Sequence, residues 1–104
     1  MNIENHKLGE ELDSFNYKQE QDAILAILNR GNNVLLDMTS CTYVSSTGLR
    51  VLLYSKKVAA SQGLNLYLVG LNEEVKDIMD TTGFDHFFDY FDTVEECLEK
   101  VGGK

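Results

Sequence analysis

The sequence is poor in the residues from which metal centres and disulfide frameworks are built. It contains two cysteines, Cys41 and Cys97, and two histidines, His6 and His86, and none of them has a partner at the spacing of a metal or redox motif. We therefore expect no metal, no cofactor and two buried thiols in a reducing compartment.

Long apolar runs and prolines are also missing. No apolar segment approaches the ~20 residues that a membrane span needs, and the N-terminal stretch MNIENHKLGEELD lacks the basic and apolar regions of a secretory signal. There is no proline and no low-complexity segment that would act as a linker. We expect residues 1–104 to form one cytoplasmic domain that is long enough to bury a core.

Basic residues are scarce. Seventeen acidic residues against nine basic ones give a formal net charge of −8, and residues 71–104 hold ten of the acidic residues but only three of the basic ones. An acidic surface repels phosphate backbones and anionic lipid, so we expect neither nucleic acid nor a membrane as a partner. The acidic segment would be either a solvated face or a docking surface for a basic partner.

The sequence does contain an alternation of helical and extended patterns. Three short segments that are apolar on both faces predict buried strands, at 33–39, 64–71 and 87–91. Four segments with apolar residues at helical spacing predict helices, at 14–31, 47–62, 72–83 and 92–103. This alternation is typical of an α/β domain, with a mostly parallel or mixed sheet of about four strands and about four helices.

Polar residues indicate where three of these helices begin. Asp13 or Ser14 would cap the first helix, and Asn72 would cap the third. Thr93 and Glu96 have the spacing of a capping box before the fourth.

A hydroxyl cluster, Ser45-Ser46-Thr47 followed by Gly48, lies between a predicted strand and a predicted helix. One hydroxyl at this place would cap the helix by accepting from a free N–H group of its first turn. Capping does not account for three hydroxyls, nor for a glycine that weakens the helix it begins. The positive helix end would tolerate a phosphoryl group, and Arg50, one turn beyond Ser46, would pair with that group or with an acidic partner.

Catalysis by this cluster is not indicated. A serine nucleophile needs a base, neither histidine is placed by the sequence to supply one, and the G-x-S-x-G pattern is absent. Asp37, in or at the end of the strand 33–39, supports an alternative: a receiver-like or small-ligand-binding domain with an aspartyl phosphoacceptor. That type also requires an acidic pair after an earlier strand, which this sequence lacks. Otherwise Asp37 is a strand-end residue satisfied by backbone groups or solvent.

The stretch VLLDMTSCTYVSSTGLRVLL resembles the central motif of STAS domains, in particular of bacterial anti-sigma-factor antagonists. In that motif a strand ends in a Leu-Asp-Leu-like tripeptide, and Asp-Ser-Ser/Thr-Gly-Leu opens the following helix. The resemblance continues through QGLNLYLVGLNEEVKDIMDTTGFDHFFDYFDTVEECL and covers residues 34–100. Two departures are that Ser45 replaces the motif aspartate and that only eight residues precede Gly9 in the Gly-Glu-Leu-Asp-like stretch LGEELD. The N-terminal hairpin is therefore expected to be shortened.

The resemblance implies a mechanism. Such proteins are phosphorylated by a serine/threonine kinase, itself an anti-sigma factor, on the serine that matches Ser46, and a serine phosphatase reverses the modification. The unphosphorylated form binds the anti-sigma factor and frees the sigma factor, whereas the phosphorylated form does not bind. Ser45, Thr47, Gly48 and Arg50 would then contact the partner of a non-enzymatic module. A sheet edge left open by a short N-terminus would favour a homodimer.

Overall fold

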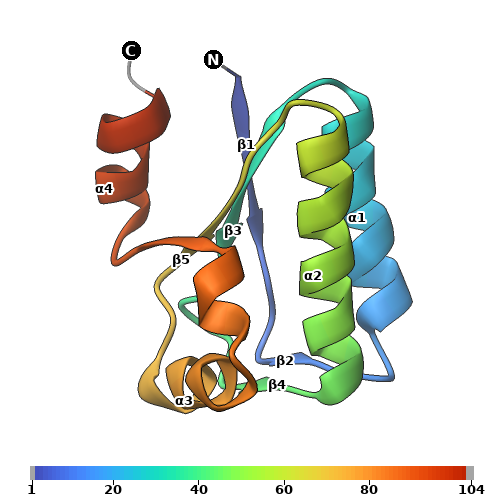
Figure 1. Cartoon of the computed structure of the whole chain (residues 1–104), viewed down its shortest axis with the longest axis vertical. Coiled ribbons are helices and arrows are strands. Elements are labelled where there is room, and N and C mark those ends of the chain that lie inside the picture. Colours follow the sequence, from blue (N-terminus) through green and yellow to red (C-terminus); the bar gives the residue numbers. More distant parts are fainter. Residues whose placement is uncertain (1, 103–104) are drawn as a thin grey trace.

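A four-stranded parallel sheet forms the centre of the computed structural model, which describes residues 2–102 (Figure 1). Its strand order is β1-β3-β5-β6, and every neighbouring pair is parallel. The strands are β1 (Ile3–Lys7), β3 (Asn33–Asp37), β5 (Leu66–Val69) and β6 (Asp89–Phe91). The three predicted strands are thus confirmed with shorter ends, and the two central ones are buried because both of their faces are covered.

Helices cover both faces of the sheet, which confirms the α/β fold class (Figure 1). On one face α1 (Tyr17–Asn29) and α2 (Ser46–Ser61) lie side by side, and α3 (Glu73–Thr82) with the 3-10 turn η1 (Phe84–Phe87) closes the same core. On the other face α4 (Val94–Cys97), continued by a π-helical turn at Leu98–Gly102, packs on Leu35, Tyr67 and Val69. Position 103 of the predicted last helix lies outside the described residues.

A second, two-stranded sheet was not predicted, and it replaces the expected N-terminal hairpin. β2 (Glu11–Leu12) pairs in parallel with β4 (Tyr43–Val44) and not with β1. The chain does not reverse after β1, because the buried Leu8 donates its N–H to the carbonyl of Asp37 and so continues beside β3. As a result α1 and α2 begin next to each other, at the lower end of the molecule in Figure 1.

The start of α1 also differs from our expectation, since neither Asp13 nor Ser14 caps it. The N-cap position belongs to Asn16, whose side chain makes no capping bond. The Asp13 carboxylate instead accepts the N–H groups of Phe15 (2.9 Å) and Asn16 (3.2 Å), and Asn16 accepts the N–H of Asp13 (2.9 Å). These bonds form a tight turn before the helix, and α1 therefore begins only at Tyr17.

The other predicted caps are confirmed. The side chain of Asn72 accepts the N–H of Val75 at 2.9 Å, and the Thr93 hydroxyl accepts the N–H of Glu96 at 3.0 Å. The Glu96 carboxylate in turn accepts the N–H of Asp92, so the capping box is formed.

Both cysteines are free and buried, as expected. Burial raises the pKa of the Cys97 thiol to about 11 and also raises that of Cys41. Because the thiolate is the reactive form and a raised pKa disfavours it, we expect neither thiol to act as a nucleophile at neutral pH.

Ser55 lies in the middle of α2, fully buried, and its hydroxyl has no hydrogen-bond partner among residues 2–102. We expect Ser55→Ala to raise the free energy of unfolding by about 1 kcal/mol, because it removes a buried unpaired polar group and improves helix propensity. Urea denaturation measures the change. The control is Ser61→Ala, whose exposed hydroxyl donates to the Val58 carbonyl, and its effect should stay within ~0.5 kcal/mol. A loss of stability in Ser55→Ala would contradict the absence of a partner.

Candidate functional site

Ser45 is the N-cap of α2. Its backbone N–H donates to the carbonyl of Leu12 (2.9 Å), and its hydroxyl accepts the N–H of Gly48 (3.1 Å). Serine and aspartate serve about equally well at an N-cap, so the replacement of the motif aspartate keeps the local geometry of the helix start. Capping therefore accounts for one of the three hydroxyls, that of Ser45.

Ser46 is the first residue of α2, and its side chain is exposed. No hydrogen bond within the described part of the chain holds its hydroxyl, which leaves this group available to a modifying enzyme. The helix start supplies unpaired N–H groups and the positive end of the helix dipole, both of which favour an added anion.

Gly48 is buried, and it is required by packing. A Cβ atom at this position would lie 2.4 Å from the carbonyl oxygen of Leu12, 2.9 Å from Leu12 Cγ and 3.0 Å from Val44 Cγ1. The first turn of α2 thus rests directly on the β2–β4 pair. Gly48, which the resemblance includes among the partner contacts, is buried, so packing accounts for the glycine at this position.

Thr47 and Arg50 line a cavity of about 450 Å³ between α1 and α2. The remaining lining residues are Ser14, Tyr17, Gln21, Val51 and Tyr54. No local signal in the sequence points to Ser14, Tyr17 and Gln21, because the pairing of β2 with β4 and the packing of α1 against α2 bring them to this cavity. The site is therefore larger than the hydroxyl cluster.

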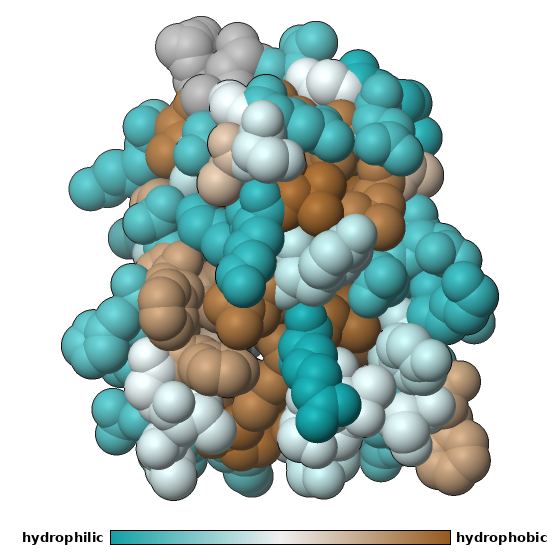
Figure 2. Space-filling view, turned by 45° about the vertical axis from the view of Figure 1, so that its right-hand side comes forward, coloured by the Kyte–Doolittle hydropathy of each residue, from teal (hydrophilic) through white to brown (hydrophobic). Residues whose placement is uncertain are grey.

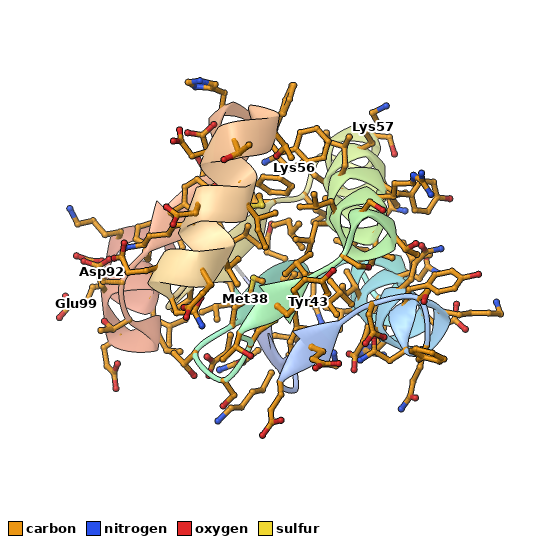
Figure 3. The ribbon with its side chains drawn as sticks, turned by 90° about the horizontal axis from the view of Figure 1, so that it is seen from below. Met38, Tyr43, Lys56, Lys57, Asp92 and Glu99 are labelled. Atoms are coloured by element: carbon orange, nitrogen blue, oxygen red, sulfur yellow. The ribbon has the colours of Figure 1, made fainter. Side chains whose placement is uncertain are left out.

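Exposed aromatic rings surround this end of the two helices. Phe15 is 96% exposed, and Tyr43 and Tyr54 are each 50% exposed. Figure 3 looks at this end of the molecule and places Tyr43 near its centre, beside the strands that precede α1 and α2. In Figure 2, which turns the α1–α2 side toward the reader, apolar surface is visible between the polar side chains. Exposed aromatic side chains of this kind are enriched in protein–protein interfaces.

Charge is divided between the two sides of the molecule. Helix α2 carries Arg50, Lys56 and Lys57 and no acidic residue, and none of the three forms an ion pair with another residue between 2 and 102. The acidic residues of α4 and of the segment before it lie on the opposite side of the sheet, as Asp92 and Glu99 illustrate in Figure 3. Helix α3, with four acidic residues, packs on the same face of the sheet as α2. The net charge of the chain therefore does not describe the surface around Ser46.

Asp37 lies at the end of β3, where one of its carboxylate oxygens accepts the backbone N–H (3.0 Å) and the hydroxyl (2.7 Å) of Thr39. The prediction of a satisfied strand-end residue is thus confirmed. Within residues 2–102 no three side chains of histidine, cysteine, aspartate or glutamate gather as metal ligands would, and no helix is long and apolar enough to cross a membrane.

Comparison with known proteins gives a consistent result. The model of the STAS domain matches residues 5–97. A Thermotoga neapolitana protein that carries the name of an anti-sigma factor antagonist is 33% identical over 78 residues, 74% of this chain and 69% of that protein. The anti-sigma-B factor antagonist of Staphylococcus epidermidis is 27% identical over 78 residues, 74% of this chain and 72% of its own length.

Among solved structures, a Thermotoga maritima protein described as an anti-sigma factor antagonist superimposes with a TM-score of 0.89. The two chains are 25% identical, and the match covers 97% of this chain and 88% of the other.

Proposed function

Because the chain belongs to the STAS domain family, we propose that it is an anti-sigma-factor antagonist that binds an anti-sigma factor kinase and so releases a sigma factor. The observation that carries this proposal is the exposed Ser46 at the first position of α2, which the resemblance to anti-sigma-factor antagonists matches to the phosphorylated serine of that family. Relatives named as anti-sigma factor antagonists support it.

Phosphorylation of Ser46 by the kinase partner would end the binding, and a serine phosphatase would restore it. The division of roles at the helix start supports this switch: Ser45 caps α2, so a phosphoryl group on Ser46 removes no cap. Thr47 and Arg50 would contact the partner beside Ser46, whereas Ser45 and Gly48 would hold the helix start in place. The protein would act in the cytoplasm as a binding module without a reaction of its own.

The experiment that tests this proposal uses the chain with its anti-sigma factor kinase and ATP. We expect wild type and Ser45→Ala to take up one phosphate as a stable ester, and Ser46→Ala to bind the kinase but take up none. Intact-mass spectrometry reads the result. Full phosphorylation of Ser46→Ala would refute the assignment. Hydroxylamine-sensitive labelling by acetyl phosphate without a kinase would instead support Asp37 as the acceptor.

We also propose that β1, an edge strand of the sheet, pairs with a second copy of the chain. Its inner bonds involve the carbonyl of Asn2 and the N–H of Leu8, so the alternation of the ladder points the N–H of Asn5 outward. Asn5→Pro removes that outward donor and should shift a concentration-dependent dimer to monomer in analytical ultracentrifugation. Light scattering that gives a monomer for wild type at high concentration would count against this dimer.

A further inference from the structure

We propose, on the basis of the function proposed above, that the partner docks with an acidic patch on the cationic side of α2. Arg50 would receive a partner carboxylate in the cavity between α1 and α2. The whole chain has a net charge of −8, which by itself would favour a basic partner. The inference therefore concerns the local charge of the surface around α2 and not the net charge of the molecule.

The α1–α2 layer carries a net positive charge, because its basic residues Lys18, Arg50, Lys56 and Lys57 outnumber its acidic residues Glu20 and Asp22. On α1, Glu20 bonds His6 at 2.6 Å and Asp22 pairs with Lys18 at 3.8 Å. Helix α2 adds three cations without ion-pair partners in residues 2–102 and contributes no acid.

Acidic groups without an ion-pair partner in residues 2–102 lie on α3 and on the segment before α1. The Asp13 carboxylate there is held by two backbone N–H groups, which lower its pKa. The neighbouring Asp13 carboxylate raises the pKa of Glu11.

The cavity has the chemistry of a carboxylate receptor. Arg50 is the single charged residue among those that line it, and none of them is acidic. The hydroxyls of Ser14 and Thr47 and the amide of Gln21 are further donors in the same walls. A guanidinium binds a carboxylate through two parallel hydrogen bonds, which fixes orientation as well as charge. The exposed rings of Tyr17 and Tyr54 lie in the same walls and would pack against the partner beside that pair.

Charges close to Arg50 dominate the electrostatic potential there, because charges farther away are screened by salt. The molecule measures 33 × 25 × 23 Å, and the acidic residues of α4 lie across the sheet from α2. At physiological salt, charges are screened over ~8 Å, so those acids contribute little to the potential at Arg50. The acidic side then serves as a solvated face.

The same arrangement gives the switch at Ser46 an electrostatic basis. A phosphoryl group carries a charge of about −1.5 to −2 and would stand one helical turn from Arg50. It would pair with the guanidinium and repel the carboxylates of the partner. Phosphorylation would therefore remove the cation that the partner needs.

Charge reversal on the two sides of the molecule tests the inference with the anti-sigma factor kinase as probe. Arg50→Glu should weaken binding about tenfold or more and Lys57→Glu about threefold, with unchanged melting temperatures. Arg50→Lys should retain part of the affinity. The matched control is Lys100→Glu, which makes the same change in net charge in the turn after α4 and should stay within about twofold. Unchanged or tighter binding by Arg50→Glu, or an equal loss in Lys100→Glu, would overturn the inference.

A second measurement separates this inference from the proposed function, because it needs no kinase. In a nitrogen-15 NMR titration of the whole chain, hexaglutamate should shift amide signals of residues 47–57 and hexalysine should shift those of α3 and α4. If wild type fails to bind the kinase, the proposed function is wrong, and this titration still decides the charge of the α2 surface. Hexaglutamate that leaves the α2 signals unmoved would overturn the inference.

Discussion

Gly48→Ala is expected to destabilise the domain by about 3 kcal/mol. The added Cβ would lie 2.4 Å from the backbone oxygen of Leu12, which cannot rotate away as the end of a flexible side chain would. Moving β2 aside would stretch the bond from the Ser45 N–H to that oxygen and open the core around the fully buried Leu12. The better helix propensity of alanine, about 1 kcal/mol, offsets only part of this cost.

Urea denaturation followed by circular dichroism measures the loss. Gly9→Ala is the matched control, since nothing lies within 4 Å of its added Cβ, and its effect should stay within ~0.5 kcal/mol. Equal stability of the two variants would show that the first turn of α2 does not rest on β2 as described.

Phosphorylation of Ser46 is expected to weaken binding to the anti-sigma factor about a hundredfold while changing the free energy of unfolding by less than about 0.5 kcal/mol. The modification adds a dianion to an exposed side chain at the positive end of α2, where the fold accepts it. The partner, in contrast, would meet a bulky charge where it had met a hydroxyl. Ser46→Asp, with less charge and bulk, should weaken binding about tenfold.

Titration calorimetry on the phosphorylated and the unmodified protein gives the comparison, and thermal unfolding of both gives the stability. Ser45→Ala is the control for the neighbouring hydroxyl. This variant should lose about 1 kcal/mol of stability, because the cap of α2 is lost. Phosphorylation of its Ser46 should still weaken binding. A phosphorylated form that binds as tightly as the unmodified protein would exclude the switch. A stability loss above about 1 kcal/mol would indicate that phosphorylation acts by unfolding.

The order of the elements and the family follow from the sequence, because both depend on signals that are local. A strand such as Val34–Leu36, buried on both faces, needs a continuous apolar run, and such a run is visible without a structure. Asn72 and Thr93 cap their helices through N–H groups three residues away, so their spacing alone predicts them. The motif around Ser46 is equally local, and it carried the resemblance to STAS domains.

The tertiary structure alone decided how the site is built. Strands β2 and β4 have two residues each, which is too short for an alternation of apolar and polar residues to be recognised in the sequence. Their pairing joins segments that lie about thirty residues apart in the chain. That pairing brings Ser14 and Tyr17 to the cavity of Arg50 and makes Gly48 a packing requirement. It also fixes the backbone of Ser45 on Leu12, so that Ser45 caps the helix and Ser46 faces solvent. Which hydroxyl holds the fold and which is free for a switch depends on contacts between distant segments, and these leave no pattern along the chain.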